Sequence, residues 1–278
     1  MERAFEAFIP VPEGAGLIMV IEKEFGPAGA ADWAKAARRI AGIVKCAFGT
    51  GALYDRDVLE EKIKAYKSCG ISTMIGGSLT ESAIVNAGGY EKSHLGSYLA
   101  YARSLGFTHI EFSDGSIYVP EDKRRDIIRM CIDAGFNVIS EVGKKDPDKD
   151  AKLTIEKRIE LMEKDLQSGS AMVIIEARES GKGIGVMTAD GKVMFPELDR
   201  IIKSVGLKNV MIEAPNKGQQ QDIYVRYGPG ANVGNVQPHD IFSAGALRAG
   251  LRGDTMKALM KDAWRAYHRS QNAPEDCM

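Results

Sequence analysis

The sequence predicts a single-domain (β/α)8 barrel of the TIM type, in which eight parallel strands close on themselves inside a ring of helices. Eight short apolar runs rich in β-forming residues recur along the chain. Charged segments with helical periodicity separate most of them, and a glycine commonly ends each helical segment. An open doubly wound sheet is the competing architecture, but eight strands at fairly even spacing favour the closed barrel.

The expected strands follow from the apolar runs, which are short enough to be fully buried strands. They lie at residues 17–21, 43–46, 71–75, 108–112, 137–141, 172–176, 209–213 and 231–235. Between them, residues 57–67, 121–134 and 155–167 show helical periodicity. Stops such as Ser68-Cys69-Gly70 and Ser168-Gly169 follow, because glycine adopts the left-handed conformation that ends a helix and turns the chain into the next strand.

The length fits one domain. The chain has 278 residues, and α/β barrels commonly run to about 250 residues as a single unit. We expect an N-terminal extension at residues 1–14, the barrel at 15–262 and a polar C-terminal tail at 263–278, loosely ordered from about Ser270. With 44% hydrophobic residues, the chain can bury a substantial core.

The charge balance limits the partners. Lys and Arg number 37 against 38 Asp and Glu, so no global basic field exists to hold nucleic acid or an anionic membrane. A small-molecule partner is expected. The four cysteines show no metal-binding spacing and are interpreted as reduced thiols in the cytoplasm. The first residues do not resemble a signal peptide, and the run 17–21 is too short to span a bilayer, so we expect no export or anchoring.

Four expected strands carry a glutamate at or next to their carboxyl end: Glu111, Glu141, Glu176 and Glu213. In a barrel, the carboxyl ends of the strands face the active site. Each glutamate is flanked by an apolar residue that period-two alternation turns toward the helices. The sequence therefore predicts four carboxylates that point inward.

Such a cluster needs cations, because like charges in one cavity repel strongly. Lys45 belongs to the second strand, Lys144 and Lys145 follow the fifth, and Arg178 follows the sixth. Oxygen ligands at this density also suit Mg²⁺. The alternative is a buried salt-bridge network that only makes the barrel rigid, although barrels usually derive stability from the opposite face.

The later loops carry candidate anion-binding groups, as barrels commonly do. The segment 178–185 combines glycines with cations, but it is not a dinucleotide fingerprint, since residues 186–193 indicate a hairpin instead of a helix. Arg248 and Arg252 lie four residues apart and reach either a phosphate, solvent or another subunit. The candidate substrate-binding residues are Arg178, Lys144, Ser180, Gly181, Lys182, Gly183, Asn235, Arg248 and Arg252.

These strand-end motifs resemble the phosphosulfolactate synthase family, the barrel enzymes that add sulfite to phosphoenolpyruvate on the route to coenzyme M. The resemblance extends over about residues 15–256, with a motif on nearly every strand end. The motifs are Gly49-Thr50 with 55–58, Gly76-Gly77-Ser78-Leu79, 110–115, 141–145 with 148–150, 176–185, Glu213-Ala214-Pro215, 219–221 and 247–255. Cys46-Ala47-Phe48, Thr80 and Gly234 depart from the family pattern and leave the charged groups intact.

The resemblance implies a Michael-type addition that gives 2-phospho-3-sulfolactate, with Mg²⁺ as cofactor and phosphoenolpyruvate and sulfite as substrates. Under it, Glu111, Glu176, Glu213 and Asp114 are candidate metal ligands, and Lys145, Lys45 and Glu141 are candidate catalytic residues. Lys145 is assigned as the proton donor, because it shares parity with Glu141 and a partly buried lysine can have its pKa moved toward neutrality. Lys45 and Arg178 would bind substrate anions.

Two other functions stay open at this point. A Schiff-base aldolase or lyase would use Lys45 or Lys145 to attack a carbonyl of a small phosphorylated acid. A non-catalytic barrel would bind a phosphorylated ligand, since a fold does not decide a function. Whichever function applies, we expect the chain to form a homo-oligomer.

Overall fold

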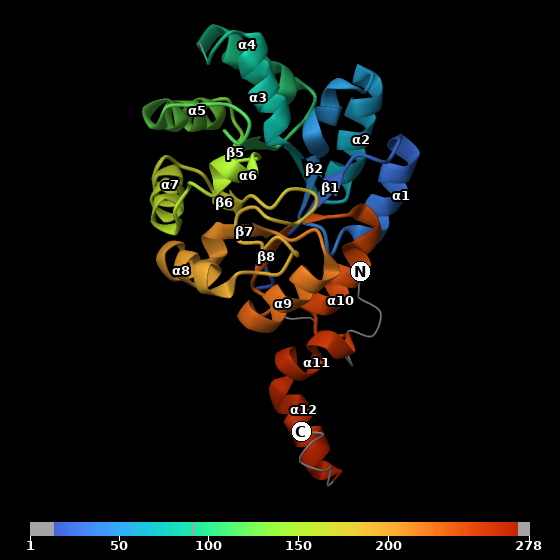
Figure 1. Ribbon diagram of the computed structural model, residues 1–278. Coiled ribbons are helices and arrows are strands. Elements are labelled where there is room, and N and C mark those ends of the chain that lie inside the picture. The colour runs from blue at the N-terminus through green and yellow to red at the C-terminus, as the bar shows by residue number, and fades with distance from the viewer. Residues whose placement is uncertain (1–13, 91, 272–278) are drawn as a thin grey trace.

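The computed structural model describes residues 14–90 and 92–271. Eight parallel strands form a closed barrel in chain order, with β1 paired to β8 (Figure 1). The strands are β1 Ile18–Glu22, β2 Ile43–Cys46, β3 Ser72–Ile75, β4 His109–Phe112, β5 Asn137–Val142, β6 Met172–Ile175, β7 Val210–Glu213 and β8 Asn232–Val236. The predicted fold class is confirmed, and no strand boundary differs from the predicted run by more than one residue.

Helices surround the barrel (Figure 1). They are α1 Pro27–Ala37, α2 Arg56–Ser68, α3 Gly77–Asn86, α4 Lys92–Ser104, α5 Glu121–Asp133, α6 Pro147–Asp150, α7 Ile155–Gln167, α8 Phe195–Val205, α9 Lys217–Tyr227, α10 Ile241–Arg248, α11 Gly253–Leu259 and α12 Lys261–Ser270. Short 3-10 turns occur at Ala47–Ala52, Leu207–Asn209 and Pro238–Asp240. The three predicted helical segments correspond to α2, α5 and α7.

The chain turns from helix into strand at glycines, as predicted. Gly70 follows α2 with a φ of 76°, and Gly135 follows α5 with a φ of 88°. A side chain at either position would strain the backbone, whereas glycine adopts this left-handed region readily. This local preference is what makes each connection from helix to strand short.

Of the C-terminal helices, α11 packs against α9 and α10, and α12 extends away from the barrel (Figure 1). Residues 263–270, the first part of the predicted polar tail, belong to α12 in the structure. Residues 1–13 and 272–278, which hold most of the predicted extension and the rest of the predicted tail, lie outside the described residues. Within the described chain, no helix is long and apolar enough to cross a membrane.

The apolar core has an inner and an outer part, as the two faces of each strand require. Inside the barrel, the buried cluster consists of Met19, Ile43, Met74, Ile139, Met172, Ile174 and Met211. On the outer face, residues such as Val44, Val173 and Ile212 pack with the helices. Because apolar side chains fill the interior of the barrel, polar groups gather at its carboxyl end.

Candidate active site

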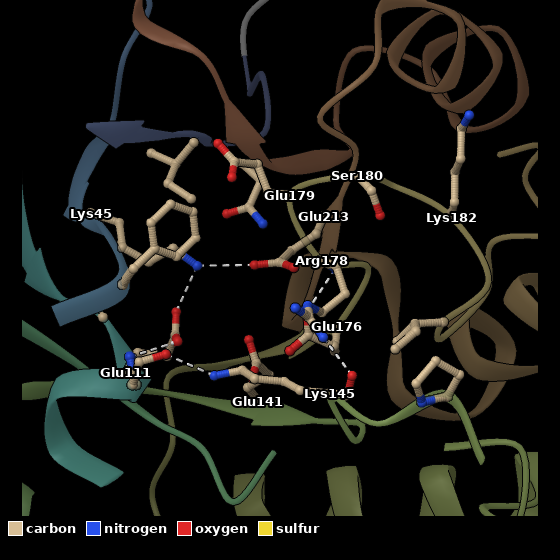
Figure 2. A pocket seen from close by; sticks show the side chains of 18 residues that line it. Lys45, Glu111, Glu141, Lys145, Glu176, Arg178, Glu179, Ser180, Lys182 and Glu213 are labelled. Carbon is tan, nitrogen blue, oxygen red and sulfur yellow. Dashed lines mark hydrogen bonds and ion pairs between the residues drawn. The ribbon is translucent and has the colours of Figure 1, made fainter. Parts of the chain in front are cut away.

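A cavity opens at the carboxyl ends of the strands, with a volume of about 630 Å³. This is within the usual range for a small-molecule site. Ten of the predicted site residues line it: Lys45, Glu111, Glu141, Lys145, Glu176, Arg178, Ser180, Lys182, Glu213 and Asn235. Figure 2 shows that lysine and arginine groups lie among the four glutamates, while Lys182 stands apart on its own loop.

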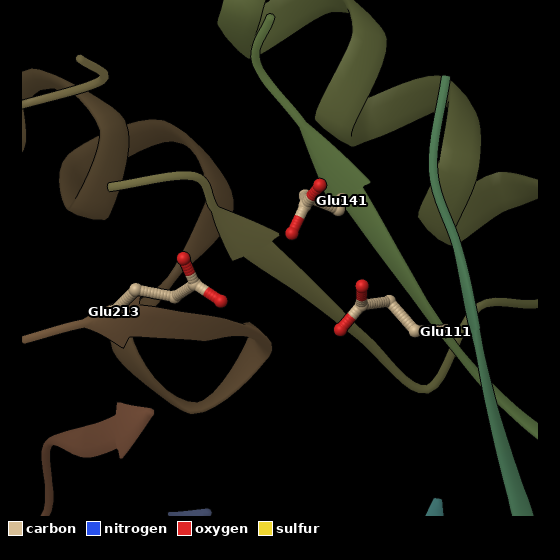
Figure 3. A group of neighbouring side chains, drawn as sticks. All are labelled: Glu111, Glu141 and Glu213. Atoms are coloured by element: carbon tan, nitrogen blue, oxygen red, sulfur yellow. The ribbon is translucent and has the colours of Figure 1, made fainter. Parts of the chain in front are cut away.

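Three of the glutamate side chains converge from different strands (Figure 3). One carboxylate oxygen from each of Glu111, Glu141 and Glu213 lies within 4.8 Å of the others, and all three residues are buried. Glu176 directly follows β6 and lines the same cavity. The inward orientation expected from period-two alternation is therefore observed for the whole set.

The ammonium group of Lys45 lies between two of these carboxylates (Figure 2). Its Nζ donates to Glu111 Oε2 and to Glu213 Oε1, both at 2.9 Å. The second oxygen of Glu111 accepts from the Gly77 amide at 2.7 Å, and that of Glu213 from the Ala177 amide at 3.1 Å. Both buried carboxylates thus have a donor on each oxygen, as buried polar groups normally require.

The cluster holds more negative charge than its lysines neutralise. Burial, and then the charges of Glu176 and Glu111, raise the pKa of Glu141 well above its usual 4.5. Burial also raises the pKa of Glu213 to about 7, although Lys45 opposes this change. Burial by itself would lower the pKa of Lys45, but Glu111 and Glu213 raise it well above 10.5. At neutral pH, the site therefore favours either bound protons or a further cation.

Two buried acceptors in the cavity have no hydrogen-bond partner, namely Glu176 Oε2 and Asn235 Oδ1. The other oxygen of Glu176 accepts from the Arg178 amide at 2.7 Å. Asn235 has a φ of 57°, which is unusual outside glycine. A buried acceptor without a donor costs about 1–3 kcal/mol, and a hydrated cation satisfies such acceptors. The donor set of the cavity thus fits a hard divalent cation.

Lys145 enters the cavity from the loop after β5. Its Nζ donates to Ser78 Oγ at 2.9 Å and pairs with Glu81 Oε2 at 3.5 Å. Burial tends to lower the pKa of Lys145, but Glu141 and Glu81 outweigh it and raise the pKa above 10.5. The expectation that this pKa moves toward neutrality is therefore wrong, because the surrounding carboxylates stabilise the protonated ammonium.

The glycine-rich segment after β6 forms one wall of the cavity. Arg178 adopts a φ of 62°, and its Nη1 donates to the carbonyl oxygen of Lys145. Glu179 forms an ion pair with Lys23, which follows β1. The segment thereby connects the loops after β1, β5 and β6 across the mouth of the barrel.

The backbone of this segment needs glycine at its end. A Cβ on Gly185, whose φ is 65°, would lie 2.0 Å from the carbonyl oxygen of Glu176. The predicted hairpin is confirmed by an antiparallel bridge between Met187 and Val193. The backbone N–H groups at the N-terminus of α9 are partly satisfied by a capping box formed by Asn216 and Gln219.

Known proteins are similar in sequence to this chain over most of its length. The family model described as (2R)-phospho-3-sulfolactate synthase (ComA) matches residues 9–254. The phosphosulfolactate synthase of Methanocaldococcus jannaschii is 42% identical over 253 residues, which cover 91% of this chain and 98% of the relative. The chain belongs to the phosphosulfolactate synthase family. The enzyme of that name from Bacillus subtilis is 35% identical over 213 residues, covering 76% of this chain and 81% of the relative.

Membership in the phosphosulfolactate synthase family makes the chain an enzyme of that type. Solved structures with a similar fold include phosphonopyruvate hydrolase in complex with oxalate and Mg²⁺, with a TM-score of 0.53, 14% identity, and coverage of 95% of this chain and 85% of the other. 3-Hexulose-6-phosphate synthase from Salmonella typhimurium has a TM-score of 0.52 at 13% identity and covers 88% of this chain and 99% of its own. At these identities the likeness concerns the fold alone.

Six predicted site residues of this synthase-family chain do not line the cavity: Asp114, Lys144, Gly181, Gly183, Arg248 and Arg252. Lys144 Nζ pairs with Asp114 Oδ2 at 2.7 Å, and the other oxygen of Asp114 accepts from Arg124 at 2.9 Å. Asp114 is thus paired with two cations outside the cavity. The predicted metal role of Asp114 and substrate role of Lys144 therefore have no support in the geometry.

The two distal arginines lie elsewhere in the barrel. Arg248 Nη1 donates to the carbonyl oxygen of Gly16, which precedes β1 and so lies at the amino end of the barrel, opposite the cavity. Arg252 pairs with Asp254 and donates to Ser243. Among the glycines, the Gly181 carbonyl accepts from Gln219. The substrate contacts proposed below therefore do not include Arg248, Arg252 or Gly181.

Sequence reasoning missed the part of the site that comes from the β3 loop and α3. Gly76, Gly77 and Ser78 line the cavity, and Glu81 contacts Lys145 from the same helix. The glycine pair directly after an apolar run was a signal of close backbone approach. Glu81 gives no such signal, since it lies inside a helix and away from any strand end.

Proposed function

We propose that this chain adds sulfite to phosphoenolpyruvate in the presence of Mg²⁺ and forms 2-phospho-3-sulfolactate. The observation that carries the proposal is the buried group of four glutamates with Lys45 and Lys145 at the carboxyl end of the barrel. It occurs in a chain that is 42% identical to a phosphosulfolactate synthase over nearly its full length. Both substrates are small anions, which matches a cavity of about 630 Å³ with cationic groups on its wall.

Glu111, Glu141 and Glu213 would hold the magnesium ion, and Glu176 Oε2 and Asn235 Oδ1 offer further acceptors. Mg²⁺ takes oxygen ligands and keeps several of its waters. When bound, it stabilises negative charge that develops on a substrate carboxylate. Its charge would also favour the ionised form of Glu213, whose pKa is raised to about 7 by burial first and then by Glu176 and Glu111.

The remaining chemistry uses groups of the chain. The sulfur lone pair of sulfite forms a bond to the methylene carbon of phosphoenolpyruvate, and the double-bond electrons move onto the carboxylate side. Lys145 Nζ gives a proton to the adjacent carbon and so completes the addition. Burial opposes the charge of Lys145, but the carboxylates outweigh it and raise the pKa, so Lys145 is protonated at neutral pH and has a proton to donate.

Anion binding is assigned to the cations on the cavity wall. Arg178 and Lys182 line the cavity from the loop after β6, and Lys45 lies at its centre. Arg178 is held by its bond to the Lys145 carbonyl, so its guanidinium has a defined direction. Ser180 adds a hydroxyl to the same wall. These groups would bind the phosphate, carboxylate and sulfite charges.

A Schiff-base mechanism has less support from the geometry. It needs a neutral lysine amine as nucleophile. The carboxylates raise the pKa values of both Lys45 and Lys145, and Lys45 is also bonded to two glutamates at 2.9 Å. Both lysines are therefore held as ammonium groups, and borohydride treatment with a small phosphorylated acid that carries a ketone or aldehyde is expected to trap no adduct.

The proposal is tested with the purified chain, phosphoenolpyruvate, sulfite and Mg²⁺. Loss of the enol absorbance should accompany a product with the mass of phosphosulfolactate. Reactions without sulfite, or with EDTA, are the controls and should form none. A folded wild-type protein that makes no product under these conditions would refute the proposed function, and activity unaffected by EDTA would refute the magnesium requirement.

A further inference from the structure

A buried carboxylate outside the ring of strand-end glutamates contacts the proposed acid. Glu81, on α3, is 3% exposed. Its Oε2 lies 3.5 Å from Lys145 Nζ, and its Oε1 accepts from Ser113 Oγ at 3.1 Å and from the Ser116 amide at 3.0 Å. Contacts on both oxygens leave this carboxylate little freedom to turn. It therefore offers Lys145 a fixed negative partner.

The same helix gives Lys145 a second contact. Ser78, one turn before Glu81, accepts a hydrogen bond from Lys145 Nζ at 2.9 Å. The backbone of Lys145 is fixed as well, since its amide donates to the Gly115 carbonyl at 3.1 Å. A Cβ on Gly115 would lie 3.2 Å from Lys145 Cγ, so the side chain passes closely over this glycine. Lys145 is thus held at both its backbone and its ammonium group.

Glu81 contacts Lys145 from outside the cavity in which the reaction is proposed to occur. It does not line the cavity of the glutamates, whereas Ser78 and Lys145 do. Glu81 instead lines a separate cavity of about 280 Å³ together with Ser78 and Ser116. A substrate in the main cavity would therefore meet Ser78 and Lys145 but not Glu81.

We propose that Glu81 and Ser78 are positioning residues that hold Lys145 Nζ toward the substrate carbon. The inference rests on the proposed function, in which Lys145 is the proton donor. A lysine side chain has about 2 kcal/mol of rotamer entropy, so an unsupported ammonium would occupy many directions. Catalysis depends on holding the reacting groups in one geometry, and α3 supplies that restraint. The Gly76-Gly77-Ser78 motif after β3 then has a role, because it brings the start of α3 to the cavity.

The first experiment compares Glu81→Gln and Ser78→Ala with Ser82→Ala. Ser82 is exposed on α3, and its hydroxyl bonds only back to the Ser78 carbonyl among the described contacts, so it is the matched control. Glu81→Gln keeps the shape and removes the charge. We expect kcat to fall about 10- to 100-fold, with KM for phosphoenolpyruvate and sulfite within twofold, because misplacement of a reacting group costs rate. Ser78→Ala should show a smaller loss of kcat, and Ser82→Ala none.

A merely structural role predicts a different pattern. Distortion of the barrel would lower Tm and raise KM for both substrates together with any loss of kcat. Wild-type kcat in Glu81→Gln, or loss of kcat only in proportion to a lost folded fraction, would overturn the proposal. Glu81→Asp keeps the charge and should recover part of the rate lost in Glu81→Gln.

The second experiment tests whether Glu81 acts through Lys145. In a Lys145→Ala background, Glu81→Gln should change the residual rate of product formation by less than twofold, because its target is gone. A loss as large as in the wild-type background would show an independent action and overturn the proposal. Failure of the proposed function is distinguishable, since in that case the wild-type protein itself makes no phosphosulfolactate.

Discussion

Replacement of Glu213 by glutamine is expected to remove a loss of stability that the wild-type protein undergoes as the pH rises, while it reduces activity. Glu213 is 1% exposed, and burial raises its pKa from 4.5 to about 7. Because this pKa is raised in the folded state, the stability that the group contributes is complete below about pH 4.5 and is lost as the pH rises through 7. At about 1.4 kcal/mol for each pH unit between these values, ionisation of Glu213 costs the fold about 3 kcal/mol.

Glutamine resembles the protonated carboxyl group and does not ionise. The free energy of unfolding of Glu213→Gln, measured relative to the wild type at the same pH, should therefore rise by about 2.5 kcal/mol between pH 5 and pH 8. Urea unfolding followed by circular dichroism, with EDTA present, measures both values. Glu61→Gln is the control, since Glu61 is exposed on α2. A difference between variant and wild type that is the same at pH 5 and pH 8 would refute the reasoning.

Addition of Mg²⁺ provides a second comparison for the same variant. A ligand at 100 times its dissociation constant stabilises the folded protein by about 2.7 kcal/mol. Wild type at pH 8 should gain stability with Mg²⁺, and Glu213→Gln should gain less, because one proposed ligand is missing. Equal gains would place the ion away from Glu213.

Three further changes give separate expectations. Lys145→Ala should lose at least about 100-fold in kcat while it still binds phosphoenolpyruvate in calorimetry; an unchanged rate would remove Lys145 as the acid. Gly185→Ala should lower the free energy of unfolding by more than about 2 kcal/mol in urea, since its Cβ would lie 2.0 Å from the Glu176 carbonyl oxygen. Arg252→Ala should keep KM for phosphoenolpyruvate within twofold in steady-state assays, because Arg252 pairs with Asp254 outside the cavity; a large increase would place it in the site.

The strand-end glutamates show which side-chain positions can be predicted from the period-two alternation of a strand. A parallel strand buried on both faces reads as an apolar run, and its side chains alternate between barrel interior and helices. A charged residue at the end of such a run, on the side of the strand that faces the barrel interior, therefore points into the cavity at the carboxyl ends of the strands. Glu111, Glu141, Glu176 and Glu213 follow this rule, and all four line the cavity.

Residues just past the strand ends do not follow this alternation of side-chain directions. Lys144 is next to the cavity residue Lys145 in the sequence, and Asp114 lies three residues after Glu111, yet the two pair with each other outside the cavity. The loop backbone decides this, as Gly143 with a φ of 152° and Arg178 with a φ of 62° illustrate. Side chains alternate between the two faces only while the backbone is extended. The direction of a side chain in the following loop therefore cannot be inferred from its number of residues past the strand.

The sequence by itself determined the barrel, its strand boundaries and the carboxylates at its mouth, because these depend on local periodicity and on glycine stops that act within a few residues. Only the tertiary structure decided the charge environment of the proposed acid. Glu81 lies in α3 and Lys145 in the loop after β5, 64 residues later, and the charges of Glu141 and Glu81 together raise a pKa that sequence reasoning expected to fall. The sum of charges around a buried lysine depends on every element packed against it, and no local pattern records that sum.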